Sequence, residues 1–135
     1  MRARDALGRP VDADSPEAVD PVDEAPLPPY DAVALGRLLL ARGRAFSAHE
    51  VFEASWKASP APERELWQGL AQVCVGVTHL QRGNRVGAVR LLRRGAGLLA
   101  GRKPEYGVDV PRVAADALRI AADIEAGREP TPLLV

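Results

Sequence analysis

The apolar residues of this chain recur at helical spacing in five consecutive segments, and glycine or proline separates each segment from the next. Side chains that recur every three or four residues share one face of an α-helix, so each segment predicts an amphipathic helix. The expected helices cover residues 32–42, 48–57, 63–82, 85–100 and 110–126. No stretch alternates with the period of a half-buried strand. The sequence therefore predicts an all-α fold, a compact bundle of about five helices that are mostly antiparallel neighbours.

Polar residues at the expected helix starts define four of these boundaries more sharply. Asp31 is expected to cap the first helix. Ser47 is expected to cap the second, because Glu50 follows three residues later at the capping-box spacing. Asn84 and Asp109 are expected to cap the fourth and fifth helices.

Residues 1–29 differ in composition from the rest of the chain. They hold three basic and seven acidic residues and six prolines, with few large apolar side chains. The formal charge of zero is thus the sum of −4 in this segment and +4 in the remainder. Such a composition predicts a disordered or extended acidic tail, which could contact the basic body. We expect a single helical domain at 30–128 and a C-terminal tail at 129–135.

Several classes of protein are disfavoured by composition. The single cysteine, Cys74, allows neither an internal disulfide nor a thiolate metal cluster. No apolar run approaches the ~18 residues of a membrane span, and no apolar stretch follows the first arginines as in a signal peptide. We therefore expect a cytoplasmic protein with no membrane partner. A protein partner or a homo-oligomer remains open.

The second predicted helix carries a cluster of polar side chains on an otherwise apolar segment. His49, Glu53 and Trp56 are spaced at i, i+4 and i+7 and share one face, and Glu50 precedes Glu53 by three residues. An imidazole with carboxylates can bind a divalent metal ion or act as a general acid–base pair. Candidate catalytic residues are His49, Glu50 and Glu53. Candidate metal ligands are His49 and Glu53, with Glu50 and His79, the only other histidine, as further ligands.

The spacing of this cluster departs from familiar metal motifs. A zincin helix places histidine at both i and i+4, and a di-iron bundle uses Glu-x-x-His, usually twice. The alternative is structural: His49 would be hydrogen-bonded to a carboxylate or a main-chain group, Glu50 would cap the helix, and Glu53 would pair with an arginine. The residues alone leave both readings open, and with them the question of whether the protein is an enzyme.

The motif His49-Glu50-x-x-Glu53-x-x-Trp56 resembles the signature of the bacterial and archaeal domain-of-unknown-function family 309. The preceding Gly43-Arg44-Ala45-Phe46, the Gln-Gly-Leu-x-Gln of residues 68–72 and Arg82-Gly83-Asn84-x-x-Gly87-Ala88 also resemble the family pattern. The resemblance covers about residues 31–125 and implies an all-helical fold. It implies that the four motif residues act together, and metal binding has been proposed for that motif. It implies no substrate, because the role of the family is not established.

Other candidate binding residues lie outside this cluster or at its edge. Trp56, Gln72 and Asn84 are candidate ligand contacts, although Trp56 in the core and Asn84 as a helix cap are the structural alternatives.

Arg90, Arg93 and Arg94 form a possible anion-binding ridge on the fourth helix. No glycine-rich phosphate loop or aromatic platform accompanies that ridge, so nucleic acid is disfavoured. Three functions remain open at this point: a metal- or small-ligand-binding domain, a non-enzymatic helical interaction module, and an anion or nucleic-acid backbone binder.

Overall fold

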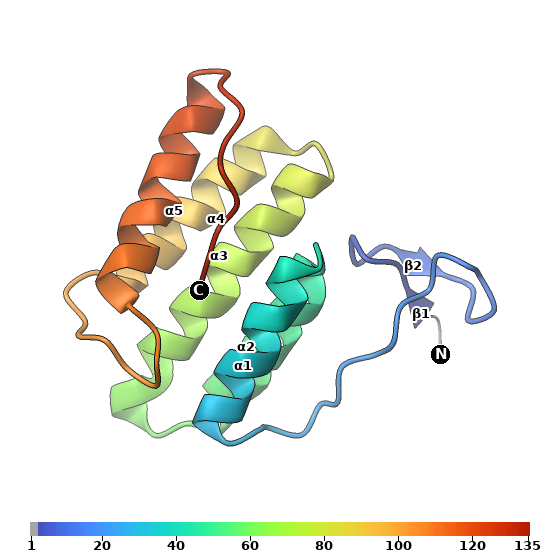
Figure 1. The fold of residues 1–135 in the computed structure, drawn as a ribbon, viewed down its shortest axis with the longest axis horizontal. Helices are drawn as coiled ribbons and strands as arrows, with labels where there is room; N and C mark the ends of the chain where they lie inside the picture. Colours follow the sequence, from blue (N-terminus) through green and yellow to red (C-terminus); the bar gives the residue numbers. More distant parts are fainter. Residues whose placement is uncertain (1–2) are drawn as a thin grey trace.

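A computed structural model describes residues 3–135 and contains five helices that form one bundle (Figure 1). The helices are α1 (Pro29–Ala41), α2 (Ala45–Ala58), α3 (Ala61–Gln81), α4 (Arg85–Leu99) and α5 (Val110–Glu125). Each helix packs against the next one along the chain. The predicted all-α bundle of five helices is therefore confirmed. In the same residues, none of the helices has the length and apolar composition needed to cross a membrane.

The core is built around α3, whose buried side chains face the other helices. Trp67 of α3 stacks on Phe52 of α2, and both are fully buried. Where α3 faces α4, glycines allow the two helices to approach closely. A Cβ added at Gly69 would lie 2.7 Å from the Leu99 side chain, and one at Gly95 would lie 2.9 Å from the main-chain oxygen of Gly69. Larger residues at these two positions would push the helices apart.

Two of the four predicted helix caps are confirmed. The Asn84 side chain accepts a hydrogen bond from the main-chain N–H of Gly87 at 3.0 Å, at the start of α4. Asp109 accepts one from the N–H of Arg112 at 3.3 Å, at the start of α5. Each bond satisfies one of the main-chain donors that a helix leaves free in its first turn.

The other two caps are wrong. Helix α1 begins at Pro29, so Asp31 lies within its first turn. Helix α2 begins before Ser47, whose buried hydroxyl instead lies 3.0 Å from Arg44 Nη2. The reason is the tight connection: Gly43 adopts a φ of 74°, which lets the chain reverse and start α2 earlier than a serine cap requires.

The N-terminal segment, residues 3–28, is extended and contains the remaining regular structure of the described chain. Strands β1 (Ala3–Arg4) and β2 (Pro10–Val11) pair antiparallel, with Ala3 opposite Val11 and Arg4 opposite Pro10. The Asp5 carboxylate closes their turn by accepting hydrogen bonds from the N–H groups of Leu7 and Arg9. The expectation of no strand is therefore wrong for four residues, because a local Asp contact stabilises a turn that apolar periodicity does not reveal.

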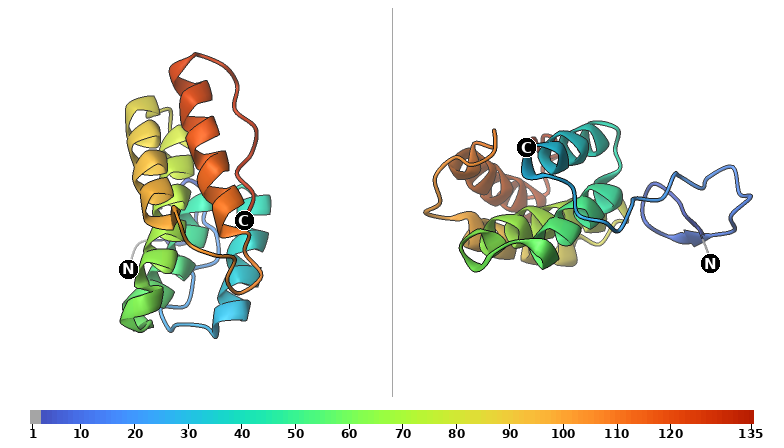
Figure 2. Two further views of the ribbon diagram at one scale, coloured as in Figure 1. Left: turned by 90° about the vertical axis from the view of Figure 1, so that its left-hand side faces the viewer. Right: turned by 90° about the horizontal axis from the view of Figure 1, so that it is seen from below.

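From this hairpin the chain runs along the outside of the bundle to the start of α1 (Figures 1 and 2). At the other end of the chain, residues 129–135 return from the end of α5 and lie between α5 and α1 (Figure 1). We call residues 129–135 the C-terminal strap. Leu133 and Val135 of the strap are only 6% and 5% exposed and join the hydrophobic core.

Candidate functional site

The imidazole of His49 is engaged on both sides by groups of its own helix region. Its Nδ1 lies 3.0 Å from the main-chain oxygen of Phe46, and its Nε2 lies 2.8 Å from Oε2 of Glu53. These partners are three residues before and four residues after His49, the spacings that α2 brings together. Both partners are acceptors, so the two hydrogen bonds form together only when each ring nitrogen carries a proton.

Glu53 links this imidazole to a second cation on the same helix. Its Oε1 lies 3.0 Å from Nζ of Lys57, which is one turn further along α2. Burial by itself raises the pKa of Glu53, but the hydrogen bonds from Lys57 and His49 outweigh burial and leave that pKa below its usual value. The cluster thus places the Glu53 carboxylate between the His49 imidazole and the Lys57 ammonium group along one helix face.

Glu50 is in a different environment. None of the hydrogen bonds and ion pairs formed within residues 3–135 uses its carboxylate. Burial raises the pKa of Glu50, and the nearby charges of His49, Arg4 and Arg44 only partly oppose that effect. Glu50 is therefore a half-buried acid, and one of the positive charges that offset its burial, Arg4, belongs to the N-terminal segment.

The N-terminal segment is fastened beside this cluster at Phe46. The ring of Phe46 contacts the His49 ring edge-on, with centroids 5.0 Å apart. The guanidinium groups of Arg4 and Arg82 lie 5.0 and 5.7 Å from the centroid of the same ring. Arg82 also donates from Nε to the main-chain oxygen of Leu7 at 2.8 Å. The N-terminal segment therefore contacts the arginine-rich body. These contacts use a main-chain oxygen and an arginine of the segment, and not its acidic side chains.

The four predicted metal ligands are not brought together as a metal site. Across residues 3–135, no three His, Cys, Asp or Glu side chains are grouped so that they could hold a metal ion. His79 lies in the last turn of α3, where its Nδ1 is 3.2 Å from Nδ2 of Asn84. Burial lowers the pKa of His79, and the charges of Arg82 and Arg90 lower it further. A histidine among arginines is a poor neighbour for a further cation.

Of the three candidate ligand contacts, Trp56 and Asn84 are engaged by neighbouring residues of the fold, and within residues 3–135 Gln72 is not. Trp56 is partly buried against the core, and the guanidinium of Arg64 lies 5.7 Å from its ring centroid. Asn84 is occupied as the cap of α4 and as the neighbour of His79. The Oε1 atom of Gln72 is buried and has no hydrogen-bond partner in the described chain.

The predicted arginine ridge on α4 is divided. Arg93 reaches across to α5, where its guanidinium pairs with both carboxylate oxygens of Glu125 and lies 3.1 Å from one of them. Arg90 and Arg94 are exposed. The ridge thus offers two arginines to solvent, with the third committed to a contact between helices.

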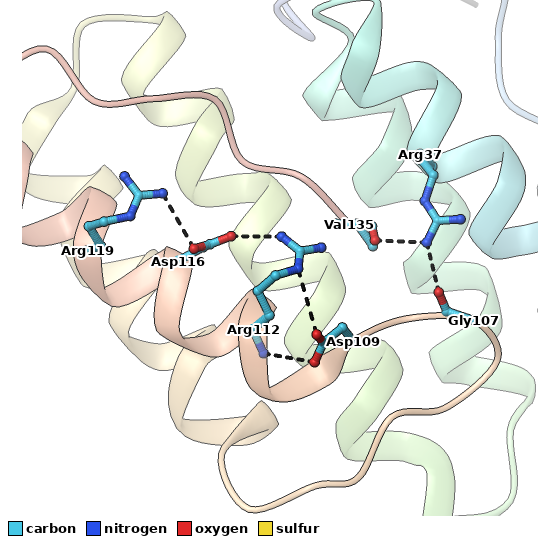
Figure 3. Close-up of polar contacts among 7 residues, drawn as sticks. All are labelled: Arg37, Gly107, Asp109, Arg112, Asp116, Arg119 and Val135. Atoms are coloured by element: carbon cyan, nitrogen blue, oxygen red, sulfur yellow. Dashed lines mark hydrogen bonds and ion pairs between the residues drawn. The ribbon is translucent and has the colours of Figure 1, made fainter.

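A groove that the sequence reasoning missed lies between α1, α5 and the strap. It has a volume of about 910 Å³, and its apolar lining includes Leu40, Ala41, Ala45 and Val77. Arg37 of α1 bridges two distant segments at this groove (Figure 3).

Nη2 of Arg37 donates to the main-chain oxygens of Gly107 at 3.0 Å and Val135 at 2.8 Å. On the α5 side, Asp116 lies 2.9 Å from Arg112 and 3.5 Å from Arg119 (Figure 3). The lining comes from segments far apart in the chain, so no local motif marks the groove. The only sequence signal is the apolar run Leu133-Leu134-Val135.

The fold and the motif together define a small all-helical domain whose second helix carries His-Glu-x-x-Glu-x-x-Trp. Residues 33–91 match the model of the family described as Domain of unknown function (DUF309), and this match supports the family resemblance. The match runs from α1 into α4, and the N-terminal segment, α5 and the strap lie outside it. No curated protein and no solved structure matches the chain.

Proposed function

We propose that this protein is a non-enzymatic helical interaction module, in which His49 and Glu53 stabilise α2 and Glu50 faces the N-terminal segment. The observation that carries the proposal is that an acceptor lies against each ring nitrogen of His49, the main-chain oxygen of Phe46 on one side and the carboxylate of Glu53 on the other. A metal ion or a substrate at this imidazole would have to displace one of these two neighbouring groups.

The distribution of exposed apolar side chains supports an interaction surface on the side of α1 and α5. Six large apolar residues are exposed in the described chain, and four of them lie on α1, α5 and the strap. These four are Tyr30, Leu38, Leu118 and Leu134. Of these four, Leu134 lines the groove, and exposed apolar side chains are typical of surfaces that bind another protein.

Binding of a metal ion or small polar ligand through His49, Glu50 and Glu53 is the competing proposal. It would require the His49 ring to turn away from at least one of its present partners. Anion binding through Arg90, Arg93 and Arg94 has less support, because Arg93 is paired with Glu125.

The two histidines provide a matched test of the proposal. Unfolding of tag-free wild type, His49→Ala and His79→Gln would be measured with and without Zn²⁺, Mn²⁺, Ni²⁺ and Mg²⁺. We expect His49→Ala to lower the free energy of unfolding by about 1–2 kcal/mol, because one hydrogen bond of the neutral ring, or both of the protonated ring, are lost. We expect His79→Gln to have a smaller effect, because its contact with Asn84 is exposed.

For the interaction module, none of the metal ions should raise the melting temperature of any of the three proteins. Stoichiometric bound metal, or a metal-dependent rise that disappears in His49→Ala, would assign the function to the cluster instead.

A further inference from the structure

The interaction module proposed above needs a partner of defined chemistry, and the lining of the groove indicates what that chemistry is. We propose that the groove between α1, α5 and the strap binds an extended apolar segment of a partner protein, and that the strap, which forms one wall of the groove, is an internal segment which this partner displaces. The inference rests on the proposed function but uses residues outside the His49 cluster.

The strap shows which chemistry the groove accepts. Leu133 and Val135 are buried, whereas Leu134 between them is 62% exposed. Side chains at alternate positions of an extended chain point to the same side, so the surface beneath the strap takes the first and third side chains of a short extended run. Arg37 then binds the main-chain oxygen of Val135 at 2.8 Å. Two alternate aliphatic side chains and one carbonyl oxygen are features that a segment of another protein can present.

The strap is held by side chains and not by a main-chain ladder, so it can be displaced without breaking a helix or a strand. None of the hydrogen bonds between main-chain groups in residues 3–135 involves residues 129–135. Its polar contacts to the bundle are Arg37 to Val135 and Arg119 Nη1 to the Thr131 hydroxyl at 2.6 Å. A segment without a main-chain ladder opens at a lower free energy than the helices to which it is docked.

The groove is also larger than the strap requires. About 910 Å³ remains open beside the strap, next to the apolar wall of α1, α2 and α3. A tethered strap competes at an effective concentration in the millimolar range, so a partner segment must form contacts that the strap does not. The open volume provides room for them. Both hydrogen bonds of Arg37 leave from Nη2, so its Nη1 and Nε can donate to a further acceptor on the partner.

The first experiment follows the strap in the full-length protein. A spin label would be attached at Leu134→Cys, which is exposed. The native Cys74 is fully buried and burial raises the pKa of its thiol, so labelling is selective. The probe is a peptide of residues 129–135 blocked at both ends, and the control peptide carries aspartate in place of Leu133 and Val135. We expect the probe, but not the control, to increase label mobility to saturation.

The second experiment measures affinity by fluorescence anisotropy of the labelled probe. Leu133→Ser weakens docking of the strap, so we expect this variant to bind the probe about tenfold more tightly than wild type. In the Leu133→Ser background, Arg37→Met should weaken binding about tenfold, because a hydrogen bond from a charged donor is lost. Arg42→Met is the matched control, since Arg42 is an exposed arginine next to the end of the same helix, and it should leave the affinity unchanged.

Three results would overturn the inference. One is the absence of saturable binding to Leu133→Ser together with an unchanged label in the wild-type background. Another is binding that Arg37→Met leaves intact in a folded protein. A third is a two-chain mass in solution with exchanged straps, which would assign the groove to a second copy. Each of these leaves the interaction module to be judged by the metal and histidine experiment. If Leu133→Ser does not fold, the label experiment alone decides.

Discussion

The two ends of the chain are both fastened to the bundle by arginines, but they bury different groups. The N-terminal segment is held by Arg82 and Arg44, which donate to the main-chain oxygens of Leu7 and Asp20, and by the stacking of Arg4 on Phe46. The strap is held by Arg37 and by two aliphatic side chains in the core. Polar contacts to a segment contribute about 1 kcal/mol each, whereas a fully buried aliphatic side chain contributes about 1.5–3 kcal/mol. The strap should therefore be the more firmly attached end.

Arginine contacts of this kind are a use for the excess of arginine over lysine in this chain. Of the 18 basic residues, 16 are arginine and two are lysine. Within residues 3–135, six arginines donate to main-chain carbonyl oxygens: Arg4, Arg37, Arg44, Arg82, Arg85 and Arg102. The planar guanidinium presents five donors and can bridge two carbonyls, as Arg37 does, whereas lysine acts as a compact point charge. The bonds of Arg37, Arg44, Arg82 and Arg102 thus connect irregular segments to the helices or their ends, whereas Arg4 acts within the N-terminal segment and Arg85 joins α4 to α5.

The largest effect is expected from removing an apolar anchor of the strap. Leu133→Ala should lower the free energy of unfolding by about 2–3 kcal/mol, the lower part of the range for a buried leucine, because the strap can rearrange. Leu134→Ala removes the same atoms from an exposed neighbour and should change stability by less than about 0.5 kcal/mol. Chemical denaturation measures both. Equal losses in the two variants would mean that the strap is not docked through alternate side chains.

A smaller effect is expected at the N-terminal attachment. Phe46→Ala removes the ring shared by Arg4 and Arg82 and should lower stability by about 1–2 kcal/mol, because the side chain is only partly buried. Amide exchange in residues 3–22 should become faster, while exchange in α5 stays unchanged. Gly8→Ala should release the same residues, since Gly8 has a φ of 79° and an added Cβ would collide with the Phe46 ring. Unchanged exchange in both variants would show that Phe46 does not hold this segment.

Glu53 belongs to the cluster on α2 but contacts neither end of the described chain, since its partners His49 and Lys57 lie on the same helix. The folded protein keeps the pKa of Glu53 below its ordinary value near 4.5, so the carboxylate contributes stability above that pH and loses it as the pH falls further. Glu53→Gln should lower stability by about 0.5 kcal/mol at pH 7, because the group is partly exposed and screened. The difference from wild type should shrink below pH 4.5 in thermal melts. A difference that grows in acid would contradict this assignment.

The helices were predictable from the sequence because each depends on local information. Apolar spacing and the Gly and Pro breaks predicted five elements, and Asn84 and Asp109 cap their helices within three residues of chain. Ser47 failed as a cap because a glycine-based reversal started α2 earlier, and two overlapping signals cannot be ranked from spacing alone.

The candidate site was predictable only in part, because the surroundings of its residues depend on contacts between segments that are far apart in the sequence. The motif places His49 and Glu53 on one face of α2, and their hydrogen bond follows from i, i+4 spacing. Helical spacing could not show that His79 lies among arginines, because that depends on how α3 meets α4. The groove was missed for the same reason: Arg37 joins Gly107 and Val135, which are 70 and 98 residues away in sequence.

The smallest predicted effect tests how strongly Arg4 ties the N-terminal segment to the cluster. Burial holds the pKa of Glu50 above its ordinary value near 4.5, so the folded state favours the protonated acid and loses stability as the pH rises through that folded pKa. Glu50→Gln keeps the shape without the charge and should raise the melting temperature by about 1–2 °C at pH 7. Its advantage should vanish below pH 4.5, where the wild-type acid is also neutral.

The control for that change is Arg4→Gln, which removes one of the charges that favour ionised Glu50. In the Arg4→Gln background, the gain from Glu50→Gln at pH 7 should be larger, because less of the burial cost is offset. A loss of stability in Glu50→Gln at pH 7 would mean that the attraction to Arg4 and the other cations outweighs burial. In that case the N-terminal segment would be attached through a net favourable ion contact, and the contrast with the apolar strap would narrow.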